Sequence, residues 1–171
     1  DEVRPSVVNI DTKVVPQQAE MPDGMNQLED LFKYFGMPAP DQRQRRPQSA
    51  TGSGFVLDKE GHIVTNNHVV DGAQDITVRL WNGSEYKGEV IGTDPDTDLA
   101  VIKIDAPDSD LRPVKLGDSD ALKVGQFAIA MGSPRGFEGS LSLGHISALG
   151  RENLNLPGLR FQNFIQTDAA I

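Results

Sequence analysis

Short runs of β-branched and aromatic residues, each ended by turn residues, recur along most of the chain. The spacing predicts strands in the first two thirds of the sequence near Val7–Val15, Gly52–Leu57, His62–Thr65, Asp75–Trp81, Ser84–Thr93 and Leu99–Ile104. Asn82-Gly83 predicts a two-residue hairpin, because both residues tolerate positive φ. Asp58–Gly61 predicts a longer hairpin loop. Six strands are enough to close a small barrel, so the fold class is predicted to be all-β.

A second set of strands follows a predicted linker at Asp105–Pro113, with strands expected at Gln126–Met131, Ser140–Leu149 and Phe161–Thr167. Three strands cannot close a barrel, and they leave open edges. We therefore expect residues 1–105 to form a complete first barrel. Residues 106–171 are expected to form a linker and the N-terminal part of a second barrel, with more polypeptide after Ile171.

An insertion at Pro16–Ala50 separates the first two predicted strands and is too long for a structureless loop in a compact domain. Within Asn26–Gly36, four apolar residues have helical spacing and would share one face: Leu28, Leu31, Phe32 and Phe35. A helix of about three turns is marginal alone. Its apolar face would pack on its own barrel or against another subunit, unless the segment is disordered.

Composition excludes several classes of function. Twenty-five acidic residues against sixteen basic ones give a net charge of −9, which argues against a nucleic-acid partner. The one basic cluster, Arg43–Arg46, is interpreted as a solvated linker. Cysteine is absent, which removes disulfides and thiolate metal sites and is compatible with the bacterial periplasm. The three histidines lack metal-ligand spacing, so no metal is predicted. The sequence has no signal-peptide pattern and no apolar run approaching the ~20 residues that span a bilayer.

A histidine and an aspartate thirty residues apart each adjoin an apolar run, in Thr65–Val70 and Asp98–Val101. A serine hydroxyl is a weak nucleophile until a base removes its proton, and imidazole titrates near neutral pH. The base in turn needs a carboxylate on its Nδ1–H to fix its tautomer. His68 and Asp98 match these two roles in the order His, Asp, then an expected Ser.

Other residues compete for these roles. Asp94, Asp96 and Asp105 are alternatives to Asp98, although Asp94-Pro95 reads as a turn. His62 and His145 are interpreted as structural or exposed histidines. Among the serines, Ser53 precedes His68 in the wrong order for a triad, and Ser133 precedes a proline in a loop. No serine of the chain is therefore predicted to be the nucleophile.

Five motifs together resemble the HtrA (DegP/DegQ) family of serine proteases: Gly52–Val56, Val64–Val70, Asp94–Val101, Gly117–Ser119 and Phe164–Ile171. The resemblance implies a chymotrypsin-like double β-barrel, with PDZ domains expected beyond the end of this chain. It implies an ATP-independent serine endopeptidase that degrades misfolded or unfolded proteins of the bacterial envelope, needs no cofactor or metal, and self-associates as trimers or multiples of trimers. Several members of the family also act as chaperones.

The resemblance also implies roles for single residues. His68 is the general base and Asp98 its orienting group, while the serine is expected a few residues past Ile171, so the chain alone is expected to be inactive. Ile171 would line the substrate pocket, and Arg151 would open a sensor loop.

Further residues have implied regulatory roles. Phe137 lies in a loop that contacts the sensor loop in the family, and Phe32 and Phe35 lie in a regulatory loop that matches residues 16–50. Two positions depart from the family pattern: Arg135 replaces a frequent aromatic residue, and His145 replaces an aliphatic one.

One alternative from another class is a non-catalytic chaperone or binding module that keeps the protease fold. The residue at the expected serine position distinguishes the two hypotheses, because alanine or glycine there would leave no nucleophile.

Overall fold

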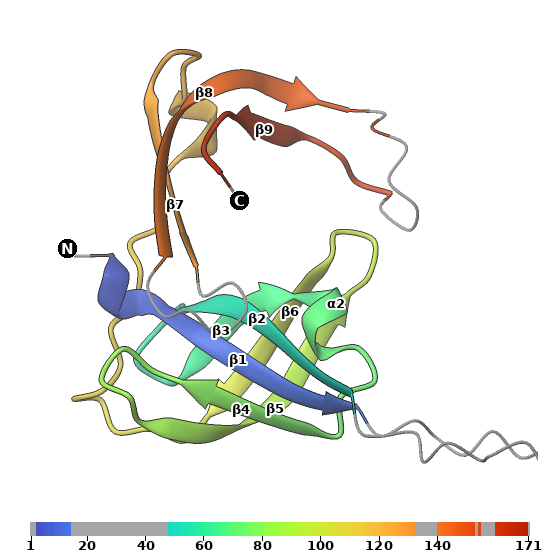
Figure 1. The fold of residues 1–171 in the computed structure, drawn as a ribbon, viewed down its shortest axis with the longest axis vertical. Coiled ribbons are helices and arrows are strands. Elements are labelled where there is room, and N and C mark those ends of the chain that lie inside the picture. Colours follow the sequence, from blue (N-terminus) through green and yellow to red (C-terminus); the bar gives the residue numbers. More distant parts are fainter. Residues whose placement is uncertain (1–2, 15–47, 133–139, 153, 155–159, 171) are drawn as a thin grey trace, which may run out of the picture.

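The computed structural model describes residues 3–14, 48–132, 140–152, 154 and 160–170, and its elements form a barrel below an open, curved sheet (Figure 1). The elements in chain order are η1 (Arg4–Ser6), β1 (Val7–Val14), β2 (Gln48–Val56), β3 (His62–Asn66), α2 (Asn67–Val70), β4 (Asp75–Arg79), β5 (Glu85–Asp94), β6 (Leu99–Ile104), η2 (Ser119–Ala121), β7 (Phe127–Gly132), β8 (Ser140–Arg151) and β9 (Phe164–Thr167). The predicted strands are all present. β2 begins four residues earlier than predicted, and β9 begins three residues later.

The first six strands close a barrel in the order β1-β2-β3-β6-β5-β4. Every pair in it is antiparallel, and the barrel closes where β1 pairs with β4. Buried residues alternate with more exposed ones along β3, β4 and β6, as period-two alternation requires. The largest fully buried apolar residues are Val8, Ile10, Val56, Ile63, Val78, Ile102, Ile104 and Leu111. The prediction of a complete first barrel of six strands is therefore confirmed, and the fold is all-β.

The hairpin between β4 and β5 differs in detail from the prediction. The Leu80 N–H donates to the Ser84 carbonyl at 2.9 Å, and the Gly83 N–H donates to the Leu80 carbonyl at 2.9 Å. These bonds define a three-residue loop rather than a two-residue one. Gly83 has φ +82°, whereas Asn82 is not among the described residues with positive φ. The loop is thus a turn followed by a left-handed glycine, the usual form of a three-residue hairpin.

The segment after β6 is attached to the first barrel rather than free. Leu111 is fully buried in the barrel core. The Lys59 ammonium donates to the carbonyls of Asp108 at 2.8 Å and Leu111 at 2.6 Å. The Tyr86 hydroxyl donates to the Asp110 carboxylate at 2.7 Å. The predicted linker therefore fixes the direction in which the chain leaves the barrel.

The second sheet has the order β7-β8-β9, all antiparallel, and arches over the barrel (Figure 1). β7 and β8 pair in regular register, with Phe127 opposite His145. One face of this pair exposes four apolar side chains next to His145: Phe127, Ile129, Leu141 and Leu143. The prediction of a three-stranded, unclosed second half is confirmed for the described residues. The barrel and the partial sheet have the arrangement that the resemblance implied, a chymotrypsin-like double β-barrel with its second barrel incomplete in the described residues.

Several predictions fall outside the described residues. They are the helix at Asn26–Gly36 with Phe32 and Phe35, the loop that contains Phe137, and Ile171. Within the described residues, no helix is long and apolar enough to cross a membrane.

Candidate active site

His68 and Asp98 lie together because β3 and β6 are neighbours in the barrel. The two strands pair with Asn66 opposite Leu99. His68 follows that pair by two residues along the chain, and Asp98 precedes it by one. Antiparallel pairing therefore places both residues at the same end of the two strands. The site forms on the side of the barrel that carries α2 and faces the second sheet (Figure 1).

His68 is in a short helix, not in the strand end that the apolar run suggested. The chain turns at Asn66, and α2 covers Asn67–Val70 with Val69 and Val70 buried. The buried valines attach this helical turn to the barrel core, and the His68 side chain is 70% exposed. The backbone of His68 is therefore fixed against the barrel, while its imidazole ring is accessible to solvent.

The Asp98 carboxylate binds His68 at two atoms. One oxygen accepts the His68 backbone N–H at 2.9 Å, and the other lies 2.7 Å from the ring Nδ1. Burial tends to raise the pKa of Asp98, but the hydrogen bonds from the His68 backbone and ring outweigh it, so the pKa lies below its ordinary value. An ionised carboxylate only accepts hydrogen bonds. In the neutral imidazole the proton is therefore on Nδ1, and Nε2 has a free lone pair.

The backbone of Asp98 is unusual, since φ is +55° and Asp98 is the only described non-glycine residue with positive φ. Its carbonyl accepts two hydrogen bonds, from the Asn66 carboxamide at 3.0 Å and from the Asn67 backbone N–H at 3.0 Å. Left-handed backbone costs an ordinary residue about 1–2 kcal/mol, and Asp tolerates it better than most. Sequence reasoning assigned no role to Asn66, although its residue type and its place two residues before His68 were visible.

The competing aspartates have other partners. The Asp94 carboxylate accepts the Asp96 N–H at 3.0 Å and the Thr97 hydroxyl at 2.8 Å, so it stabilises the turn, as predicted. The Asp96 carboxylate is 3.7 Å from Arg160. Asp105 follows the far end of β6. Asp98 is therefore the aspartate that the fold brings to His68.

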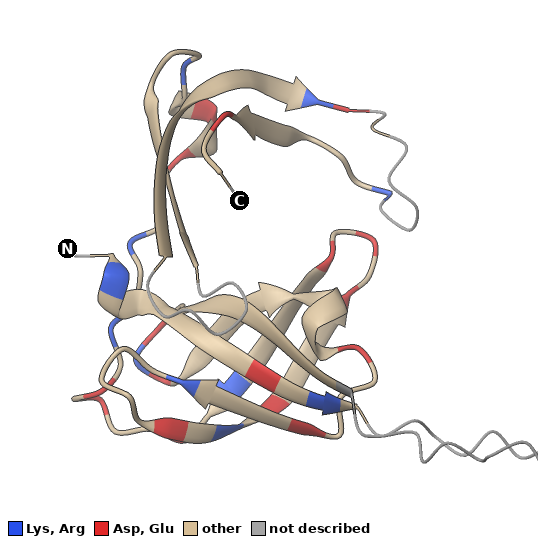
Figure 2. Cartoon of the chain, viewed as in Figure 1, with Lys and Arg blue, Asp and Glu red and all other residues tan. Residues whose placement is uncertain are grey.

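The β5–β6 turn that carries Asp98 also contacts the segment that precedes β9. The Asp96 carbonyl accepts backbone N–H groups from Arg160 at 3.1 Å and Phe161 at 3.3 Å. Figure 2 shows the acidic residues of this turn on the side of the barrel that faces the second sheet. The segment before β9 is therefore held close to the site.

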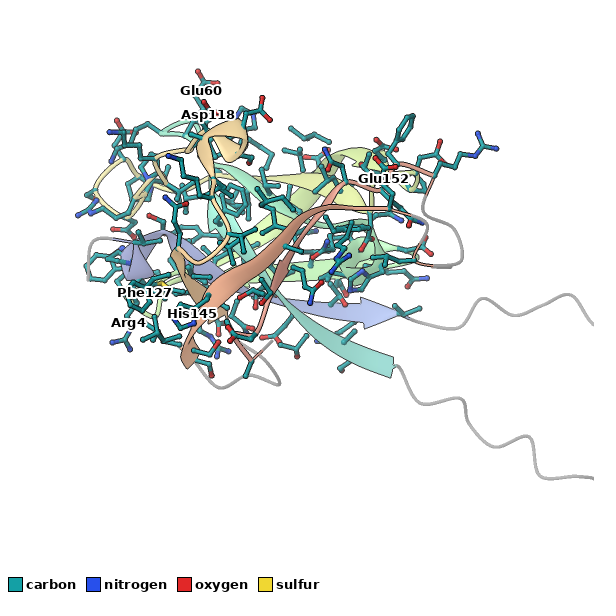
Figure 3. The ribbon with its side chains drawn as sticks, turned by 90° about the horizontal axis from the view of Figure 1, so that it is seen from above. Arg4, Glu60, Asp118, Phe127, His145 and Glu152 are labelled. Carbon is teal, nitrogen blue, oxygen red and sulfur yellow. The ribbon has the colours of Figure 1, made fainter. Side chains whose placement is uncertain are left out.

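All three histidines pair with an aspartate, so the pairing alone does not identify the base. Asp58 accepts the His62 N–H at 3.2 Å and lies 2.6 Å from its Nδ1. Asp168 accepts the His145 N–H at 2.5 Å and lies 3.8 Å from its Nδ1. His145 also stacks on Phe127, with ring centroids 5.0 Å apart, and Figure 3 shows the two side chains next to each other.

One group of potential metal ligands exists among the described residues: Asp58, Glu60 and His62. One oxygen of Asp58 accepts the N–H groups of Glu60 and His62, and the other faces His62 Nδ1. These contacts explain why the three residues lie close together: they stabilise a hairpin turn. The absence of a metal cofactor stays a prediction.

Arg151, the other predicted site residue in the described part, ends β8. Its Nε donates to the Gln166 carboxamide on β9 at 2.7 Å. The bond joins two strands of the second sheet at the end from which the β8–β9 connection leaves. The structure does not bring Arg151 into contact with His68 or Asp98 through any described hydrogen bond or ion pair.

The barrel, the partial second sheet and the His–Asp pair define a protein of the trypsin-like class. Residues 52–171 match the trypsin-like peptidase domain, and the chain belongs to this family. Within the family, the resemblance to HtrA-type proteases is confirmed by similar sequences and structures.

The similar sequences are named periplasmic serine endoproteases, DegP-like. One from Marinomonas sp. is 44% identical and aligns with 100% of this chain and 38% of its own length. One from Hahella chejuensis is 46% identical and aligns with 98% of this chain and 36% of its own. The chain thus spans little more than a third of the length of these relatives.

Solved structures of HtrA-type proteases are also similar to this chain. The HtrA-type protease AlgW with a tripeptide has a TM-score of 0.77 and 34% identity, over 99% of this chain and 44% of that one. Deg5 has a TM-score of 0.68 and 36% identity, over 99% of this chain and 70% of that one.

Proposed function

We propose that this chain supplies the general base and the orienting carboxylate of an ATP-independent serine endopeptidase. The observation that carries the proposal is the two-point contact between Asp98 and His68 inside the matched family domain. Asp98 keeps the imidazole in the tautomer whose Nε2 accepts the proton of a serine hydroxyl. The same Nε2 then returns that proton to the leaving amine as the acyl-enzyme forms.

The serine itself is proposed to lie C-terminal to Ile171 in the full-length protein, with Ile171 lining the substrate pocket. The proposed substrates are unfolded or misfolded polypeptides of the bacterial periplasm, because the relatives are named periplasmic serine endoproteases. Self-association into trimers, chaperone activity, and regulation through Arg151, Phe137, Phe32 and Phe35 are part of the same proposal and rest on the resemblance to the HtrA family.

A fluorophosphonate probe tests this function in the full-length protein. An activated serine attacks the phosphorus and fluoride leaves, so one adduct forms per active site. We expect wild-type protein to be labelled and to cleave an unfolded substrate, and His68→Ala to lose both. His62→Ala is a matched control, because it removes another aspartate-paired histidine from the same barrel, and it should keep both activities.

Two results would contradict the proposal. Equal labelling of His68→Ala and wild type would show that His68 is not the base. Absence of labelling and cleavage in wild type, together with suppression of client aggregation, would favour the chaperone alternative.

A further inference from the structure

Asn66 occupies the N-cap position of α2 but does not cap the helix. It has the extended backbone of an N-cap residue, φ −86° and ψ 147°, and its side chain makes no cap hydrogen bond. Asn at this position usually accepts an N–H of the first helical turn. Here the His68 N–H is accepted by the Asp98 carboxylate instead. Asp98, rather than Asn66, therefore caps the N-terminus of α2.

The Asn66 side chain uses its donor group in another direction, toward the Asp98 carbonyl at 3.0 Å. This carbonyl belongs to the one described non-glycine residue with positive φ. The Asn67 backbone N–H approaches the same oxygen at 3.0 Å. Two donors thus hold the carbonyl of a residue whose carboxylate must reach two separate N–H groups of His68.

We propose that Asn66 is a positioning residue for the His68–Asp98 pair: its carboxamide holds the Asp98 backbone in the left-handed conformation that lets the carboxylate bind both N–H groups of His68. The inference deepens the proposed function and rests on it. Asn66 touches neither substrate nor the reacting atoms, and it acts only through Asp98. Its loss should leave substrate binding intact and impair the orientation of the imidazole.

Three variants of the full-length protein separate this role from a general effect on folding. Asn66→Ala removes the donor. Asn66→Asp keeps the size but replaces the donor with an oxygen that faces the Asp98 carbonyl. Asn67→Ala is the matched control, because it removes the neighbouring carboxamide and keeps the backbone N–H that binds Asp98. Thermal unfolding of each variant verifies that it is folded.

The first readout is the split between kcat and KM on an unfolded substrate. We expect kcat to fall roughly tenfold in Asn66→Ala and further in Asn66→Asp, with KM within about twofold of wild type, since one hydrogen bond is lost from the orientation of the base. The second readout is the ¹⁵N NMR signal of His68, which reports the ring tautomer without any need for turnover. It should show a mixture of tautomers in both Asn66 variants and the single Nδ1–H form in wild type and Asn67→Ala. The signals of His62 and His145 should not change.

A wild-type kcat and an unchanged His68 tautomer in a folded Asn66→Asp variant would overturn the inference. If wild-type protein showed no hydrolysis, the proposed function would fail separately, and the His68 NMR signal would still decide the role of Asn66.

Discussion

Asp98 and His68 are joined by two hydrogen bonds of different kinds, one to the backbone N–H at 2.9 Å and one to the ring Nδ1 at 2.7 Å. The first fixes where the carboxylate lies relative to α2, and the second fixes the ring. The bond to Nδ1 alone would leave the carboxylate free to move together with the imidazole. The double contact therefore orients the side chain before any substrate binds.

Asp98→Asn tests the second of these bonds. Asn tolerates a left-handed backbone, so the fold should be retained. An amide group facing Nδ1 no longer enforces the Nδ1–H tautomer, and kcat in the full-length protein should fall by about 10⁴-fold. Asp98→Ala should also lose about 1 kcal/mol of unfolding free energy, because Ala disfavours this backbone conformation. Hydrolysis of an unfolded substrate and urea unfolding measure the two effects. Activity of Asp98→Asn close to wild type would rule out the orienting role.

The lowered pKa of Asp98 predicts a pH-dependent stability. Burial raises this pKa, the hydrogen bonds from the His68 backbone and ring lower it by more, and the net pKa lies below its ordinary value. The unfolded chain therefore binds this proton more readily than the folded one. Stability rises with pH between the folded-state pKa and the higher unfolded-state pKa of Asp98. The contribution is fully present above about pH 5 and is lost as pH falls through the folded-state pKa. The free energy of urea unfolding should fall more steeply in wild type than in Asp98→Asn between about pH 5 and pH 3.

The pKa values of Asp58 and Asp168 are also lowered. Both carboxylates are present in wild type and in Asp98→Asn, so their effects cancel in the comparison. Parallel curves for the two proteins would mean that the Asp98 contacts add no stability.

Gly144 on β8 is a point of close approach to the segment that follows β9. A Cβ at this position would overlap the Ala169 backbone nitrogen and the Asp168 carboxylate. Gly144→Ala should therefore displace residues 168–170, cost about 1–3 kcal/mol of stability and reduce kcat/KM at least tenfold, because small shifts in site geometry have large effects on rate. Gly92→Ala is the control, since a Cβ there meets nothing within 4 Å. Equal kcat/KM values for the two variants would show that the close approach of β8 to residues 168–170 is not needed for activity.

Ile102 tests the packing of the first barrel. Its side chain is fully buried, whereas Ile91 on β5 is 53% exposed. Ile102→Ala should lower the unfolding free energy by about 2–5 kcal/mol through lost burial and a residual cavity. Ile91→Ala removes the same atoms and should change it by less than about 0.5 kcal/mol. Thermal or urea unfolding of both variants measures the difference, and similar losses would contradict the observed core.

Local pattern was sufficient for the positions of the strands and for the identity of the candidate pair. Alternating β-branched residues and turn residues placed every strand to within four residues, because both signals depend on neighbours along the chain. The residue types and order of His68 and Asp98 indicated their chemistry. The short helix at Asn67–Val70 was missed, since four residues are too few to show helical periodicity.

Only the tertiary structure decided which groups meet. The closure of the barrel between β1 and β4, and the register that puts Asn66 opposite Leu99, depend on hydrogen bonds between segments far apart in sequence. The left-handed backbone of Asp98, the donor that Asn66 directs at its carbonyl, and the pairing of Asp98 with His68 follow from that register. By itself, then, the sequence determined the strands and the chemical types available. Their contacts were decided by long-range backbone pairing, for which no local pattern carries a signal.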